Sequence, residues 1–187
     1  SRLLMLPLGF SDEDPRGGND NTGLVKMAAR TGMNVRSTHG GFRPFADNQA
    51  AMMGRIESAA RFYEVPFWNE ATGKLTPEDE TARFFSAISL GAKGLFDWPD
   101  NVKVAREIYY RNGKNLRVER PIVDVAMFFP TTSHLLRQEG YPQVLARGCA
   151  DMRDVLNFDI VDEQTGSVLD TQDVVVIVPA VPGGVGE

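Results

Sequence analysis

The stretch Val65-Pro66-Phe67-Trp68-Asn69-Glu70 decides the interpretation of the fold, because a short apolar run ends there in polar residues. Three further apolar runs, at residues 3–8, 34–37 and 94–96, end in similar loops. The first loop residues after these four runs are about 30 residues apart. This spacing is close to the length of one strand-helix unit in a (β/α)8 barrel, which has about 250 residues in eight units. These loop residues are Gly9, Thr38, Asn69 and Asp97. The spacing predicts parallel strands that end near Leu8, Ser37, Trp68 and Phe96.

Each interval between these strands contains a segment that favours a helix. In the first interval we expect a helix from about Thr22 to just before Gly32. The second interval carries apolar residues at helical spacing, which are Met52, Ile56, Ala59 and Tyr63. In the third, Thr76 is a good N-cap and Pro77 suits the first helical position. That helix is expected to run through Ala82, Phe85 and Ser89 to Gly91.

The composition of the chain changes after Asp97. A helix-compatible segment from Val102 to about Arg111 leads into a connector, and we place a domain boundary near residue 119. A β-rich run at 122–129, a helical stretch at 142–156 and a buried-type strand at 174–178 follow. This order predicts the start of a doubly wound, flavodoxin-like α/β domain. The fold class is therefore α/β, with residues 1–119 as the last strands of a partial (β/α)8 TIM barrel and residues 120–187 as the second domain.

Composition and charge exclude several classes of protein. The 187 residues are 42% hydrophobic and 24% charged, which is typical of a globular protein and not of a disordered one. The net charge of −5 and the lack of a basic stripe exclude a nucleic-acid partner, and no run of about 20 apolar residues predicts a membrane span. The lone Cys149 is interpreted as a core residue, so no disulfide, metal or cofactor is expected.

The two ends of the chain are abrupt, and there is no initiator Met. We therefore expect a fragment of a longer protein, which by itself would be prone to aggregate or to unfold in part. The sequence does not indicate the compartment, although a cytoplasmic location is favoured.

Barrel enzymes carry their catalytic groups where strands end and loops begin. The candidate residues at these positions are His39, Trp68, Asn69, Glu70, Asp97 and Trp98. Indole faces stack on sugar rings and carboxylates act as nucleophiles or acids, so the set favours a carbohydrate site. We expect the Glu70 carboxylate to point into the barrel mouth beside Trp98, with polar or cationic neighbours.

Each candidate also has a simpler interpretation. Glu70 could begin a solvated loop, and His39 could be a turn residue. Asp97 and Trp98 could contact substrate, or the segment could cap the next helix through Asp100. His134 is expected in a loop, without a second ligand at metal-binding spacing.

Three stretches of the sequence resemble the last strands of family 42-type β-galactosidases. They are Val-Pro-Phe-Trp-Asn-Glu at 65–70, Gly-Lys-Leu-Thr-Pro-Glu at 73–78 and Gly-Ala-Lys-Gly-Leu-Phe-Asp-Trp at 91–98. In that family the nucleophilic Glu ends the seventh barrel strand. The resemblance implies a retaining glycosidase that hydrolyses O-glycosidic bonds with Glu70 as nucleophile. The acid/base Glu of the family, in an Asn-Glu pair on the fourth strand, would precede Ser1.

The connector at 118–121 and the strand at 123–130 resemble the start of the second domain of the same family. There the domain is a glutamine-amidotransferase-like fold that builds a trimer, so the resemblance implies a carbohydrate substrate and a homotrimer of the full-length protein. The zinc-binding cysteine cluster of some members is missing.

Two alternatives stay open at this point. One is a non-catalytic carbohydrate-binding or assembly module that keeps Trp68 and Trp98 without hydrolysis. The other is a single nucleotide-binding domain, which would need a phosphate loop near its first strand.

Overall fold

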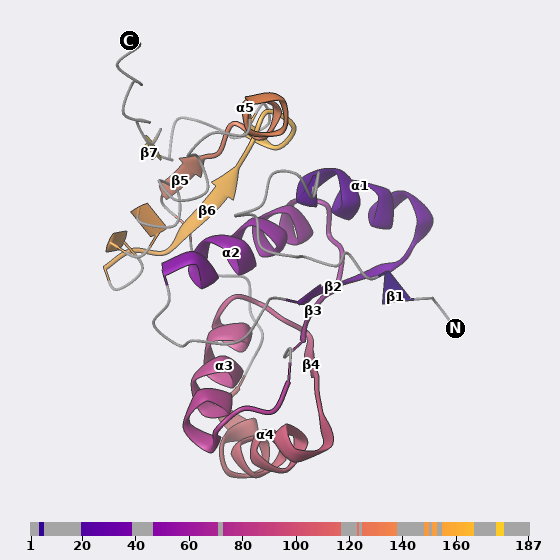
Figure 1. The fold of residues 1–187 in the computed structure, drawn as a ribbon, viewed down its shortest axis with the longest axis vertical. Helices are drawn as coiled ribbons and strands as arrows, with labels where there is room; N and C mark the ends of the chain where they lie inside the picture. Colours follow the sequence, from indigo (N-terminus) through magenta and orange to yellow (C-terminus); the bar gives the residue numbers. More distant parts are fainter. Residues whose placement is uncertain are drawn as a thin grey trace.

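The computed structural model alternates helices with parallel strands, which confirms the α/β class expected from the sequence (Figure 1). The structure describes residues 4–5, 20–38, 47–70, 73–116, 123, 125–137, 148–149, 151–152, 155–166 and 175–177. Within these ranges the strands form two sheets, one of four strands and one of three. The expected boundary near residue 119 lies outside the described residues, between the last helix of the first part and the first strand of the second.

The first sheet contains four parallel strands in chain order. They are β1 (Leu4–Met5), β2 (Asn34–Thr38), β3 (Phe67–Glu70) and β4 (Gly94–Phe96). The connecting helices are α1 (Asn21–Thr31), α2 (Asp47–Phe62) and α3 (Pro77–Ser89), and β4 is followed by α4 (Pro99–Asn112) and the 3-10 helix η2 (Gly113–Asn115). The parallel direction expected for these strands is confirmed for the residues described.

β4 ends at Phe96, as predicted, whereas β2 and β3 end one and two residues later than predicted. Thr38, Asn69 and Glu70 were expected in loops, and all three lie within strands. The reason is the backbone ladder, which pairs Thr38 with Glu70 and Glu70 with Phe96 beyond the last apolar residue of each run. Leu8 and Gly9 lie outside the described residues.

The helix ends follow from local capping, and the predicted positions of α1 and α3 are confirmed. The Asp20 carboxylate accepts a hydrogen bond from the Gly23 N–H at 2.8 Å, which starts α1. Gly32 ends it with a φ of +67°, a conformation that glycine adopts without strain. Thr76 Oγ1 accepts from the Asp79 N–H at 3.1 Å, so α3 begins at Pro77.

One hydrophobic core lies between the first sheet and its helices. Its members come from α1, β2, α2, β3, α3 and the turn before β4, and are Val25, Ala28, Val35, Ile56, Ala59, Ala60, Val65, Phe67, Ala87 and Ala92. On α3 the buried face differs from a simple apolar stripe, because Glu80 and Arg83 are buried beside Phe84 while Phe85 is 42% exposed. In the part of the chain that the structure describes, the helices that share this core therefore lie on one face of the first sheet.

The second sheet has the order β6-β5-β7, with all strands parallel. The strands β5 (Val125–Phe128) and β7 (Val175–Ile177) lie where the sequence predicted them. The prediction missed β6 (Phe158–Val161) and α5 (Thr131–Arg137), and His134 lies in this helix rather than in a loop. Of the helix expected at 142–156, residues 148–149 and 151–152 are helical.

A second, smaller core lies on this sheet. Its buried members are Met127, Phe129, Cys149 and Ile160. Burial raises the pKa of the Cys149 thiol to about 12, and its Sγ lies 3.6 Å from Met127 Sδ. Cys149 is thus a core residue, as expected. Val155 lies within the stretch at 142–156 that was predicted to be helical, but it is a turn residue and 78% exposed.

Helix α2 lies between the two sheets (Figure 1). Ile56, Ala59 and Ala60 belong to the first core. On another face of α2, Ser58 Oγ donates to Asp159 Oδ1 at 3.0 Å and accepts from the Ile160 N–H at 2.9 Å. A Cβ on Gly54 would lie 3.1 Å from Ile160 Cδ1, so the helix and β6 approach closely. The two sheets are therefore connected through contacts on both sides of one helix.

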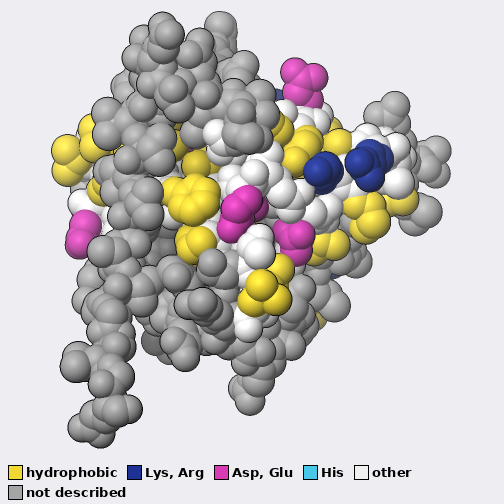
Figure 2. Space-filling view, turned by 90° about the horizontal axis from the view of Figure 1, so that it is seen from above, with side chains coloured by type: hydrophobic (Ala, Val, Ile, Leu, Met, Phe, Trp, Pro, Cys, Tyr) yellow, Lys and Arg dark blue, Asp and Glu magenta, His cyan; other side chains and the backbone are white. Residues whose placement is uncertain are grey.

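The surface seen from above carries mixed side chains. Figure 2 shows hydrophobic side chains in several separate groups, interspersed with acidic and basic ones. Leu136 on α5 is an example of an exposed apolar residue, with 78% of its surface accessible. Among the helices that are described, none is long and apolar enough to cross a membrane.

Candidate functional site

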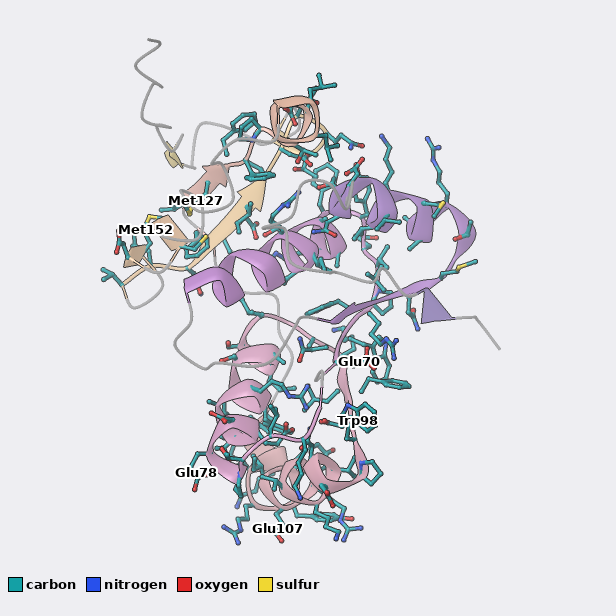
Figure 3. The ribbon with its side chains drawn as sticks, in the orientation of Figure 1. Glu70, Glu78, Trp98, Glu107, Met127 and Met152 are labelled. Atoms are coloured by element: carbon teal, nitrogen blue, oxygen red, sulfur yellow. The ribbon has the colours of Figure 1, made fainter. Side chains whose placement is uncertain are left out.

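Glu70 is the last residue of β3 and lies on the face of the first sheet away from the helices. Side chains alternate between the two faces of a strand, and the opposite face carries Val35, Phe67 and Leu95 into the core. The parallel register places a second set of residues on the face of Glu70, which are Arg36, Trp68, Gly94 and Phe96. Figure 3 shows Glu70 on the side of the sheet opposite α3. In a closed barrel this helix-free face would be the interior.

The Glu70 carboxylate is bound to a cation. Arg36 Nη1 donates to Glu70 Oε1 at 2.9 Å, and the two side chains are 10% and 21% exposed. The Arg36 Cζ lies 4.6 Å from the centroid of the Phe96 ring. Phe96 belongs to β4, on the far side of β3 from Arg36, and its ring supports the guanidinium. The cationic neighbour predicted for Glu70 is therefore confirmed, and it is provided by β2.

Arg36 itself is not fully satisfied. Its Nε is buried and has no hydrogen-bond partner among the residues described. A buried donor without a partner costs about 1–3 kcal/mol, and a partly buried ion pair returns little net stability. The arginine at this position is therefore poorly explained by stability alone.

Trp68 lies one layer below Glu70 on the same face, and its indole packs over Gly94. A Cβ added to Gly94 would come within 2.3 Å of Trp68 Cζ3 and 2.6 Å of Cε3, so only glycine fits there. The Trp68 Nε1 is buried without a hydrogen-bond partner in the described part of the chain. Trp68 thus lies beneath Glu70 on the same face of the sheet, and its expected contact with substrate stays a prediction.

Asn69 points to the opposite face from Glu70 and is fully buried. Its Oδ1 accepts from Arg83 Nη1 at 2.9 Å. Arg83 also donates twice to Glu80, at 2.9 and 2.8 Å, and forms an ion pair with Asp97. Asn69 and Asp97, both predicted to contact substrate, are therefore brought together through a buried arginine behind the strand of Glu70.

Asn101 extends this network to the loop that follows β3. Its Nδ2 donates to Asp97 Oδ1 at 2.9 Å and to the Gly73 carbonyl at 2.8 Å, and its Oδ1 accepts from the Leu75 N–H at 2.9 Å. The network consequently joins the carboxyl ends of β3 and β4 to the start of α4. We name Asn69, Glu80, Arg83, Asp97 and Asn101 the buried polar network.

The buried polar network contains two carboxylates and one guanidinium. Burial raises the pKa of Glu80 to about 7, and the charge of Asp97 adds to the rise, while Arg83 opposes it. Two carboxyl groups that share one cation at a buried site favour retention of a proton. The network therefore holds a titratable group close to neutral pH directly behind the candidate site.

Trp98 is the N-cap residue of α4 and is 55% exposed. Figure 3 shows it on the same side of the first sheet as Glu70. Asp100 does not cap this helix, because its carboxylate pairs with Lys74 at 3.2 Å on the surface. His39 lies outside the described residues, directly after the end of β2.

Sequence reasoning missed Arg36, Arg83 and Asn101. The available signal for Arg36 was a charged residue inside the segment 34–37, which was expected to be a strand. Neither Arg83 nor Asn101 stands out from the other polar residues of a helix. No group of three potential metal-binding side chains occurs within the ranges that the structure describes.

Comparisons with protein-family models, with curated protein sequences and with solved structures found no match for this chain.

Proposed function

We propose that this chain is part of a retaining, β-galactosidase-like glycoside hydrolase in which Glu70 is the nucleophile. The observation that carries the proposal is the position of Glu70 at the carboxyl end of a parallel strand, on the helix-free face, with one carboxylate oxygen held by Arg36. Catalytic carboxylates of barrel enzymes occupy this kind of position.

The topology supports the corresponding fold assignment. The described strands are parallel and in chain order, and the described helices of this part pack on one face. Consecutive units of a (β/α)8 barrel produce this arrangement, whereas a doubly wound sheet has helices on both faces. The order β6-β5-β7 matches the 2-1-3 start of a flavodoxin-like sheet. We therefore propose that the first sheet is the last part of a barrel and that the second begins a flavodoxin-like domain, which would support a homotrimer of the full-length protein.

In this proposal the carbohydrate binds across the carboxyl ends of β2, β3 and β4. Glu70 attacks the anomeric carbon and forms a covalent glycosyl-enzyme while a carboxylic acid from outside this chain protonates the leaving oxygen. Water then releases the sugar, and the two carboxyl groups would lie about 5–5.5 Å apart. The exposed indole of Trp98 provides a flat apolar wall for a sugar ring.

The decisive experiment is covalent trapping of the full-length enzyme with a 2-fluoro glycoside, followed by peptide mapping. We expect the label on Glu70 and a loss of several orders of magnitude in turnover for Glu70→Gln. The matched control is Glu64→Gln, because Glu64 is exposed in the turn before β3 and should tolerate the change. A label on another residue would overturn the assignment. An unchanged rate in Glu70→Gln with sugar binding retained would favour the non-catalytic binding module.

A further inference from the structure

Arg36 and Glu70 are diagonal neighbours on adjacent strands. Arg36 pairs in register with Trp68, which lies two residues before Glu70 on the same face of β3. A long side chain is needed to bridge such a diagonal, and the guanidinium must lean toward the carboxyl end of the sheet. The Phe96 ring lies beneath the guanidinium and holds it in this direction.

The ion pair engages only one side of the carboxylate. Arg36 Nη1 binds Glu70 Oε1, and among the described residues no hydrogen bond to Oε2 is observed. A nucleophilic carboxylate needs this asymmetry, because one oxygen must be held while the other approaches the carbon that it attacks. With only 9% of its surface exposed, Arg36 is too covered to bind a substrate as its main role.

We propose that Arg36 is a positioning residue, which fixes the Glu70 carboxylate through Oε1 and leaves Oε2 for attack on the sugar. This inference rests on the proposed function. It explains why a buried guanidinium is retained although its Nε has no partner among the described residues: the residue serves the orientation of Glu70 and not the stability of the fold. It also assigns Phe96 the supporting role of holding the guanidinium.

The inference predicts that Arg36→Met differs in its kinetics from a variant that only destabilises the fold. Arg36→Met alone would leave the Glu70 carboxylate unpaired, so stability is compared in a Glu70→Gln background and kinetics with Glu70 intact. In the Glu70→Gln background methionine fills similar space without a buried charge, so the urea midpoint of unfolding should be unchanged or higher. The rate of covalent trapping by a 2-fluoro glycoside should fall about 100-fold, because a misplaced nucleophile reacts slowly. We expect KM to change little, since Arg36 does not bind the sugar. Arg36→Lys should recover about tenfold of this loss, because lysine keeps the charge but lacks the planar fork.

Phe96→Leu provides an independent variant. It leaves Arg36 and Glu70 in place but removes the ring beneath the guanidinium, so trapping should slow about tenfold. In the Arg36→Met background the same substitution should have no further effect, because the group that it supports is gone. Arg111→Met is the matched control. The Arg111 side chain on α4 is 79% exposed, so its substitution removes a positive charge from the surface without changing a buried site.

All of these measurements use the full-length enzyme. Wild-type trapping rates in Arg36→Met would overturn the inference. A large fall in the urea midpoint when Arg36→Met is added to Glu70→Gln would also overturn it, because Arg36 would then be a structural residue. Additive effects of Phe96→Leu and Arg36→Met would also contradict it. Failure of the proposed function is seen separately, as absence of the label from Glu70 in the unmodified enzyme.

Discussion

The buried polar network makes the stability of the protein depend on pH in a direction opposite to that of most carboxylates. Glu80 and Arg83 are completely buried, and Asp97 is nearly so. Burial raises the pKa of Glu80 from 4.5 to about 7. Because the folded state then binds a proton that the unfolded state has released, the free energy of unfolding must fall as the pH rises from 4.5 to about 7.

The size of this effect follows from the pKa values. The rise of the Glu80 pKa to about 7 corresponds to about 3 kcal/mol of stability, present below pH 4.5 and lost as the pH passes about 7. Glu80→Gln resembles the protonated carboxyl and cannot ionise. We therefore expect this variant to be more stable than the unmodified protein at pH 8, by up to about 3 kcal/mol, and similar to it near pH 4.5.

Urea unfolding at several pH values between 4.5 and 8 measures this difference. Glu57 provides the control, because burial also raises its pKa to about 7 against the opposing effect of Arg61, on a different helix. Glu57→Gln should remove its own share of the pH dependence and leave that of Glu80, and the double variant should remove both. A Glu80→Gln variant less stable than the unmodified protein at pH 8 would refute the reasoning, because Arg83 would then compensate the buried charge in full.

Two further predictions concern packing and the contact between the sheets. Gly94→Ala should destabilise the protein by about 1–3 kcal/mol and shift tryptophan fluorescence, because the new Cβ collides with the Trp68 indole; urea unfolding with an unchanged midpoint would contradict it. Asp159→Asn should lower stability by about 1–3 kcal/mol in the same assay, because it removes the charge that binds Arg61 from β6. Glu107→Gln is the matched control, and its exposed pairing with Arg111 at 3.8 Å should have almost no effect.

Much of the first sheet could be predicted from the sequence. The regular spacing of the apolar runs, the Thr76-Pro77 start and the Gly32 end are local signals, and local signals determine helix ends and strand positions. The position of Glu70 at a strand end could be predicted for the same reason. Its ion pair with Arg36 required the register between two strands, which no local pattern specifies.

The second sheet was less predictable. β6 has only four residues, and Asp159 interrupts its apolar run. The charge of Asp159 is compensated by Ser58 and Arg61, which lie about 100 residues earlier in the chain, so the sequence near β6 contains no sign of it. α5 is a seven-residue helix after Pro130, too short for a periodic pattern.

The buried face of α3 shows a similar limit. Hydrophobic periodicity assumes that charged residues face water, but Glu80 and Arg83 are paired with one another inside the protein. Their partner Asp97 directly follows the next strand, β4. A pattern based on hydrophobicity therefore could not identify the network that links Asn69 to the end of β4.

Helix α2 packs against both sheets, and this restricts the substitutions that the helix can accept. A larger side chain at Ile56 or Ala59 cannot be accommodated by rotation of the helix, because rotation would drive Gly54 into β6. A change at Ser58 would remove its hydrogen bond to Asp159, which lies in the other sheet. The second sheet therefore cannot be exchanged for an unrelated module without a new surface on α2.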